Sequence, residues 1–199
     1  MNKIPLSYYQ QDDVVSLSRS LIGKYLLTCL EPENVITGGM IIETEAYRGP
    51  EDKASHAYNN RRTKRTETMF SEGGTTYVYL CYGMHHLFNI VTNKKETPHA
   101  ILIRAIQPEV GVDLMLRRRK KDKLIPTLTN GPGALCQALG INRALDGISL
   151  NSSKIWLEDR GVIIPQERIQ VSPRIGIDYA EEDALKPWRF SLKPMSVEY

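Results

Sequence analysis

The alternation of apolar and polar positions predicts a short helix followed by two strands near the start of the chain. Between Asp13 and Gly23, apolar residues recur at helical spacing, with acidic residues before them and the glycine after them, a pattern that indicates an amphipathic helix. Residues 24–30 have the composition of a strand. A turn signal at 37–39 precedes residues 40–47, which begin apolar and then alternate, so a second strand is predicted there.

The second predicted strand carries two glutamates and a tyrosine on one face. Side chains two positions apart on a strand point the same way, so Glu43, Glu45 and Tyr47 are expected together, opposite residues 42, 44 and 46. Because a buried charge is costly unless it is paired, this face taken alone is best interpreted as a solvated sheet edge. The segments that follow favour a functional interpretation, since they contain a histidine, a basic cluster and a tyrosine-rich hairpin.

The middle of the chain predicts a long loop and then a hairpin. Residues 49–74 are polar and turn-rich, with no sustained period, and long loops in compact domains are usually functional or disordered. Residues 75–81 and 87–91 have strand composition and flank the interruption at 82–86, which predicts two paired strands. Residues 100–106 predict a further strand.

The C-terminal half predicts two helices and several short strands. One helix is expected to start at Pro108 and to run through Leu116, and another covers 134–139 before Gly140. Short strands are expected at 155–157, 162–164 and 169–171, with a compact turn at 186–190. With no repeat, linker or low-complexity tract, we expect one α+β domain spanning residues 1–199, built on a mainly antiparallel sheet with a few surrounding helices.

Composition narrows the class of protein. The chain has 199 residues, 41% of them hydrophobic, which is enough for a core without disulfides or metals. A net charge of +3 is too mild to imply nucleic acid by itself. The three cysteines are far apart without a CxxC pair, so we expect reduced core thiols and no zinc site. No signal region or membrane-length apolar run is present; we therefore expect a soluble cytoplasmic protein, or a nuclear one in a eukaryotic host.

The distribution of basic residues is more informative than their number. Arg61, Arg62, Lys64 and Arg65 place four cations within five residues of the long loop. Such a cluster fits contacts to DNA phosphates, which give affinity without sequence preference. A solvated loop is the alternative interpretation.

The predicted hairpin tip has an unusual composition. Tyr82 and Met84 flank Gly83, and large apolar side chains at such a tip suit a wedge between DNA base steps. The alternative is a tip folded back on its own sheet. Tyr77, inside the preceding strand, is expected to be a packing residue. The four histidines lack metal-ligand spacing, so no metal is expected; His56 follows the carboxylate strand closely enough to approach Glu45.

A set of motifs spread over most of the chain gives a more specific signal than any short pattern. In chain order they are Glu43-Thr44-Glu45-Ala46-Tyr47, Gly49-Pro50-Glu51-Asp52, His56, Tyr77-Val78-Tyr79, Tyr82-Gly83-Met84, Asn89, Leu102-Ile103-Arg104-Ala105, Gly131-Pro132-Gly133, Leu135-Cys136-Gln137-Ala138-Leu139 and Arg174-Ile175-Gly176. Together they resemble the alkyladenine (3-methyladenine) DNA glycosylase family. One departure is that His85 and His86 stand where bulky aromatic or apolar residues are expected.

The resemblance implies a curved sheet with a protruding hairpin and a monofunctional glycosylase of base excision repair. Its substrates would be 3-methyladenine, 7-methylguanine and hypoxanthine in double-stranded DNA, and its product an abasic site without strand cleavage. We expect the enzyme to need no cofactor and to work as a monomer. The implied roles fall on Glu45 as general base, Arg104 as the holder of the flipped nucleotide or its water, Tyr47, His56 and Tyr79 as the base-stacking pocket, Asn89 as a screen of the base edge, and Tyr82 with Met84 as the intercalating tip.

The chemistry of base removal agrees with these residue types. An enzyme acting on a base inside a duplex must flip it out, and aromatic faces suit a pocket for an electron-poor base. Glycosidic cleavage passes through an oxocarbenium-like state, which a carboxylate can stabilise while it takes a proton from water. Two alternatives remain: a sugar hydrolase using Glu43 and Glu45 as a carboxylate pair, and a non-catalytic DNA-binding module in which Glu45 has no role.

Overall fold

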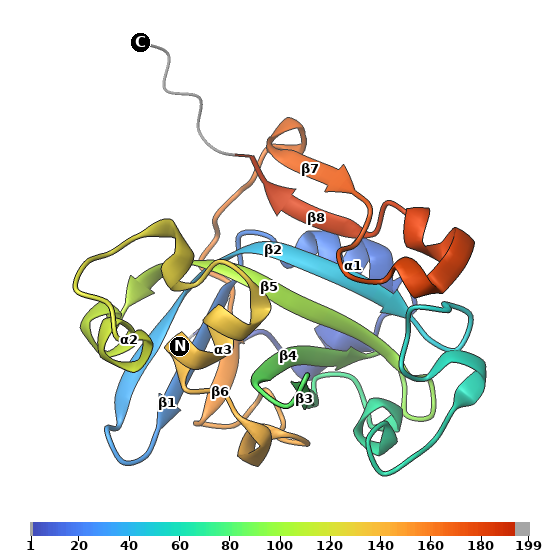
Figure 1. Ribbon diagram of the computed structural model, residues 1–199, viewed down its shortest axis with the longest axis horizontal. Coiled ribbons are helices and arrows are strands. Elements are labelled where there is room, and N and C mark those ends of the chain that lie inside the picture. The colour runs from blue at the N-terminus through green and yellow to red at the C-terminus, as the bar shows by residue number, and fades with distance from the viewer. Residues whose placement is uncertain (1, 194–199) are drawn as a thin grey trace.

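An eight-stranded sheet organises residues 2–193, the part of the chain that the computed structural model describes (Figure 1). All of its strand pairs are antiparallel, and the main order is β3-β4-β5-β2-β1-β6, with β8 joining β2 and pairing with β7. The strands are β1 (Tyr25–Leu30), β2 (Val35–Arg48), β3 (Thr76–Cys81), β4 (His85–Thr92), β5 (His99–Val110), β6 (Ile155–Glu158), β7 (Ile169–Ser172) and β8 (Arg189–Leu192).

Short helices surround this sheet. The α-helices within residues 2–193 are α1 (Val14–Ser20), α2 (Val112–Arg119) and α3 (Pro132–Leu139), and the 3₁₀ helices are η1 (Leu6–Gln10), η2 (Tyr58–Asn60), η3 (Glu67–Phe70), η4 (Pro126–Leu128), η5 (Arg143–Leu145), η6 (Gln166–Arg168) and η7 (Asp178–Leu185). Helix α1 packs on β2, and α3 packs on β4 and β5. The expected α+β class, antiparallel sheet and protruding hairpin are confirmed. The predicted limits 1–199 also include residues 1 and 194–199, which lie outside the described residues.

The first helix forms for the reasons that its sequence indicates. The Asp13 carboxylate accepts the N–H groups of Val15 and Ser16, as a helix-capping aspartate does. Gly23, three residues after the helix, has a φ of +90°, a conformation that glycine adopts readily. None of the helices in residues 2–193 is long and apolar enough to cross a membrane. All three cysteines are free, but only Cys136 is fully buried.

The predicted turn at 37–39 is wrong, because these residues lie inside the 14-residue strand β2. Gly39 stands at a register shift with β5, and a Cβ atom there would overlap the carbonyl oxygen of Gln107. The glycine therefore serves the close approach of two strand backbones, which is, besides turns, a common reason for glycine in a sheet. One edge of β2 has two partners in succession: it pairs with β1 up to Met40 and with β8 from Glu43 onward.

Other predicted boundaries also differ from the structure. Pro108 belongs to β5, opposite Gly39 at the register shift, and α2 begins only at Val112. A bulge tolerates proline because the ladder is locally interrupted there. Residues 162–164 do not form a strand, and the expected compact turn at 186–190 contains the start of β8.

Strand alternation divides the sheet residues between a core and a cavity. Phe88 of β4 and Ile101 and Ile103 of β5 are fully buried in the main hydrophobic cluster, together with residues of α1 and α3. Their neighbours of opposite parity, such as Leu102 and Arg104, line a cavity. The loop after β2 packs beside that cavity through a smaller cluster of buried residues, which consists of Ala57, Met69, Phe70, Tyr77, Val91 and Ala100.

We predict that Gly39→Ala destabilises the fold by about 3 kcal/mol, near the top of the usual cost of overpacking. The added methyl group meets backbone atoms of Gln107 and Pro108, which cannot move without disturbing the β2–β5 pairing. The melting temperature should fall by about 6–12 °C. Gly161→Ala is the control, because its Cβ meets open space and only its φ of +71° is unfavourable, at a cost of about 1 kcal/mol. Equal melting temperatures of the two variants would contradict the close-approach explanation.

Candidate active site

A cavity of about 470 Å³ opens between the β3–β4 hairpin, the loop after β2 and the segment after β7. This volume is in the range of small-ligand pockets. The side chains around it include those of Tyr47, His56, Arg65, Met69, Tyr77, Tyr79, Tyr82, Asn89, Leu102, Arg104, Ile175 and Tyr179. Most of the residues that the sequence analysis singled out therefore meet at one place.

The register of the sheet explains why residues distant in sequence meet there. Tyr77 pairs with Asn89, Asn89 with Leu102, and Leu102 with Glu45. These four residues form one row across β3, β4, β5 and β2, so their side chains share a face. A second row joins Ala100 to Tyr47.

Glu45 is completely buried, accepts two hydrogen bonds and forms one ion pair. Its Oε1 accepts the peptide N–H of Ile175 at 2.9 Å and lies 3.2 Å from Nη1 of Arg104. Its Oε2 accepts the hydroxyl of Tyr47 at 2.8 Å. A buried charge is tolerated only with such partners. All three partner residues also line the cavity, so the carboxylate lies directly behind the cavity wall.

Glu43 is also buried, and it anchors the arginine beside Glu45. Its Oε1 accepts Nε of Arg104 at 3.0 Å and Nε of Arg189 at 2.6 Å. A double irregularity in the β2–β5 ladder skips Ile42 on one strand and Arg104 on the other, which turns Arg104 toward both glutamates. The solvated-edge interpretation is therefore wrong. The same irregularity moves Ile42 into a separate cluster with Met40 and away from the face of Thr44 and Ala46.

The aromatic wall of the cavity is held together by His56. Its Nδ1 lies 2.9 Å from the Tyr77 hydroxyl, and its ring meets the Tyr79 ring edge-on at 4.7 Å. Burial, with a smaller effect from Arg65 and Arg61, lowers the pKa of His56 to about 4, so the imidazole is neutral at pH 7. His56 thus contacts Tyr77 and Tyr79 rather than Glu45.

The remaining pocket residues are fixed by their own contacts. Asn89 is buried, and its side-chain amide donates to the Tyr77 carbonyl at 3.2 Å. Tyr77 is the packing residue that was expected, yet it also lines the cavity. Burial, assisted by Glu45, raises the pKa of Tyr47 above its usual range, and burial likewise raises that of Tyr79. Both phenols are therefore protonated at neutral pH.

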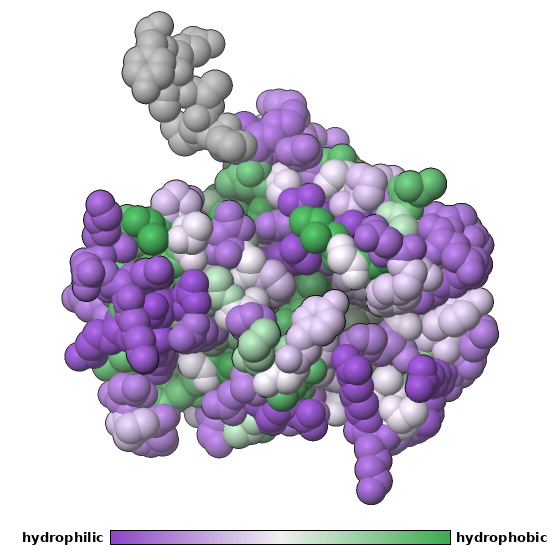
Figure 2. Space-filling model, in the orientation of Figure 1, coloured by the Kyte–Doolittle hydropathy of each residue, from purple (hydrophilic) through white to green (hydrophobic). Residues whose placement is uncertain are grey.

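The hairpin tip stands clear of the protein surface. Tyr82 is 89% exposed and Met84 is 73% exposed, which excludes a tip folded back on its own sheet. The peptide N–H of Met84 closes the turn onto Cys81, and φ is +49° at Tyr82 and +70° at Gly83. A bulky residue at positive φ is uncommon, and such strain is concentrated at functional sites. Figure 2 shows this face, with hydrophilic side chains on either side of the hairpin.

The four cations of the basic cluster have different surroundings. Arg62 is bound by Glu67 and Glu96, at 2.7 and 2.6 Å, and lies over the Phe70 ring. Arg65 lines the cavity, with its guanidinium 5.0 Å from the centre of the Tyr79 ring. Arg61 and Lys64 are exposed. Arg62 is therefore already neutralised within the protein, in part by Glu96, which lies 34 positions further along the chain.

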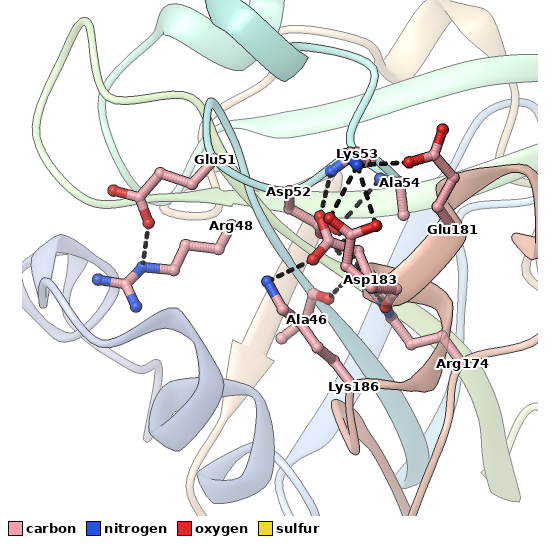
Figure 3. Close-up of polar contacts among 11 residues, drawn as sticks. Ala46, Arg48, Glu51, Asp52, Lys53, Ala54, Arg174, Glu181, Asp183 and Lys186 are labelled. Atoms are coloured by element: carbon pink, nitrogen blue, oxygen red, sulfur yellow. Dashed lines mark hydrogen bonds and ion pairs between the residues drawn. The ribbon is translucent and has the colours of Figure 1, made fainter.

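The segment between β7 and β8 supplies residues to which sequence reasoning assigned no role. Arg174 pairs with Asp52, Ile175 donates to Glu45, and Tyr179 borders the cavity while its hydroxyl donates to the Ala54 carbonyl. Arg189 binds Glu43. Figure 3 shows the polar contacts around Arg174. Asp52 and residues 174–176 belong to the motifs quoted above. The charged residues within those motifs were the sequence feature that could have pointed to a role for this segment.

Comparison with known proteins gives one consistent result. The family model described as methylpurine-DNA glycosylase (MPG) matches residues 7–195. A protein of Chlamydia felis is 50% identical over 190 residues, which cover 95% of each chain, and one of Chlamydia pneumoniae is 48% identical over 192 residues, covering 94% of this chain and 93% of its own. A protein of Bacillus cereus is 43% identical over 194 residues, with the same two coverages. All three are provisionally named 3-methyladenine DNA glycosylase.

The family model matches nearly the whole chain, and the relatives share about half of their residues with it over the same length. Both findings agree with the motifs that the sheet register brings around one cavity. The chain therefore belongs to the methylpurine-DNA glycosylase family, and it is a DNA repair hydrolase that acts on N-glycosidic bonds.

Proposed function

We propose that the protein flips alkylated or deaminated purines, namely 3-methyladenine, 7-methylguanine and hypoxanthine, out of duplex DNA. It then hydrolyses the N-glycosidic bond and leaves an abasic site, the first product of base excision repair. The observation that carries this proposal is the buried Glu45 carboxylate, whose two hydrogen-bonding partners and one ion-pair partner all line an aromatic cavity. The exposed Tyr82 beside that cavity supports the flipping step.

The cavity wall suits a damaged purine. The rings of Tyr47, His56 and Tyr79 provide surfaces for stacking. Alkylation of a ring nitrogen leaves the base of the nucleotide positively charged, and the neutral His56 does not repel it. Asn89, held by the Tyr77 carbonyl, is placed in this proposal to screen the base edge against the exocyclic amine of normal guanine.

Bond cleavage in this proposal uses Glu45 and Arg104. The C–N bond breaks with its electrons on the departing base, and the Glu45 charge stabilises the oxocarbenium-like sugar. Glu45 then takes a proton from the attacking water, for which Oε2 has a lone pair besides the one that accepts from Tyr47. Arg104 orients Glu45 and holds the flipped nucleotide or its water.

The residues around the cavity favour hydrolysis without strand cleavage. No lysine is among the described residues that line it, and Schiff-base chemistry requires such an amine. One chain supplies both the cavity and the protruding tip, so we propose a working monomer. The bacterial source of the relatives favours action on DNA in the cytoplasm over a nucleus.

The two alternatives are less well supported. A carboxylate-pair sugar hydrolase needs Glu43 to be available, but two arginines occupy one of its oxygens. A non-catalytic DNA-binding module does not account for a fully buried carboxylate behind an aromatic pocket. Turnover on alkylated DNA separates the proposal from both.

We predict that Glu45→Gln retains affinity for damaged DNA and loses excision, by about 10²- to 10⁴-fold in rate. The amide keeps the shape of the side chain but cannot accept the proton from water. Single-turnover release of the base from a duplex with one damaged purine measures the effect. Glu158→Gln replaces another buried strand glutamate, which pairs with Arg160 outside the cavity, and should excise at the wild-type rate. Undiminished excision by Glu45→Gln would remove the general base from the mechanism.

We predict that binding to undamaged duplex weakens with salt and that the basic cluster carries part of this dependence. Alanine substitution at Arg61, Lys64 or Arg65 should flatten the log–log salt slope by about 0.9 for each DNA phosphate that is no longer neutralised. Arg62→Ala should have a smaller effect, because its guanidinium is bound by two glutamates. Fluorescence anisotropy at several salt concentrations gives the slopes, and Lys154→Ala serves as the control. An unchanged slope in the quadruple alanine variant would mean that the cluster is only solvated.

We predict that Tyr82→Ala lowers the equilibrium constant for base flipping, whereas Tyr82→Phe changes it little. The flipped base leaves a hole whose unstacking costs a few kcal/mol, and a planar ring that fills it recovers part of the stacking. A fluorescent base analogue opposite or beside the lesion reports both variants in stopped flow. If Tyr82→Ala flips the base as favourably as the wild type, the tip has no intercalating role, whatever the result for Glu45.

A further inference from the structure

Arg174 lies at the centre of the contacts between the segment after β7 and the rest of the molecule (Figure 3). Its side chain is completely buried. Its two terminal nitrogens bind both oxygens of Asp52, and they also donate to the carbonyl oxygens of Ala46 at 2.9 Å and of Asp183 at 3.1 Å. The guanidinium thus joins β2, the loop after β2 and η7.

The same arginine reaches the candidate general base by two routes. Its guanidinium carbon lies 4.8 Å from the centre of the Tyr47 ring, and the hydroxyl of that ring donates to Glu45. The peptide N–H of the next residue, Ile175, donates to the other oxygen of Glu45. Two of the three groups that hold Glu45 therefore depend on where Arg174 lies.

The segment after β7 is also joined to the loop after β2 by polar contacts other than the buried Asp52–Arg174 pair. The Lys53 ammonium binds Glu181 and Glu182 at 2.5 and 2.8 Å, and the Lys53 peptide N–H donates to Asp183 at 2.8 Å. A buried pair is weak evidence for stability, because desolvation offsets much of its attraction. The bidentate fork of an arginine does, however, fix orientation in a way that a lysine does not.

We propose that Arg174, held by Asp52, is a positioning residue for catalysis. It fixes the Tyr47 ring and the Ile175 peptide N–H, and these two groups aim the Glu45 carboxylate at the cavity. The inference rests on the proposed function, in which Glu45 is the general base. It adds a charged pair that touches neither the flipped base nor the reacting bond.

Arg174→Lys tests this role, since it keeps the charge and removes the fork. Single-turnover excision should slow by about 10²-fold, the effect of a misplaced catalytic group, while affinity for the damaged duplex stays close to that of the wild type. Lys53→Gln is the matched control, because it removes the exposed ion pairs of the same segment and contacts neither Tyr47 nor Glu45. It should excise at the wild-type rate. Wild-type excision by a folded Arg174→Lys overturns the proposal.

A double-mutant cycle separates positioning from general destabilisation. If Arg174 acts through Glu45, then Arg174→Lys causes no further slowing when Glu45 is already glutamine. Additive losses overturn the positioning role and leave Glu45 as the general base, whereas wild-type excision by Glu45→Gln alone removes both the general base and the residue that positions it. Asp52→Asn enters the same cycle if Arg174→Lys does not fold, with the same two outcomes, because it weakens the other half of the pair and keeps its shape.

Discussion

The burial of the Glu45 carboxylate is the constraint on which the arrangement of the site depends. A charge with no solvent exposure needs hydrogen-bond donors or opposite charges from the protein, and Glu45 obtains two hydrogen bonds and one ion pair from three parts of the chain. Tyr47 comes from the same strand, Arg104 from the neighbouring strand, and Ile175 from the segment between β7 and β8. The sheet register and the closure of that segment must both be correct before the carboxylate is satisfied.

The charged groups around Glu45 form two supports with different geometry. On one side Glu43 binds Arg104 and Arg189, and so holds the arginine that contacts both the cavity and Glu45. On the other side, Asp52 and Arg174 form a buried pair under the Tyr47 ring. Both supports are possible because each carboxylate meets a guanidinium, whose several donors satisfy more than one acceptor.

The cavity and the hairpin tip meet opposite physical requirements. The aromatic part of the cavity wall consists of protonated phenols and a neutral imidazole, all of them partly buried, with the His56 and Tyr79 rings packed edge-on. The tip holds Tyr82 and Met84 in solvent, on a turn whose backbone is strained at Tyr82. An aromatic-walled pocket beside a protruding aromatic side chain suits an enzyme that must first unstack a base and then hold it for hydrolysis.

The sequence by itself determined the local elements and the chemistry of the motifs. Helix α1 (Val14–Ser20) follows from periodicity and its Asp13 cap, and the tyrosine-rich hairpin from strand composition and its turn residues, all of which act over short distances. The motif set also identified many of the residues that meet around the cavity. Turn signals were misleading where glycine serves close packing, as at Gly39, and where proline lies opposite it in a bulge.

Only the tertiary structure decided which groups satisfy one another. Asp52 and Arg174 are 122 positions apart, and the Ile175 N–H that binds Glu45 is 130 positions from it. Arg62 is neutralised by Glu96, and Glu43 is held by Arg189. No short-range pattern encodes these pairs, because they depend on the sheet register and on where the last segment closes. Burial then makes each pairing obligatory, since an unpaired charge inside the protein is too costly to keep.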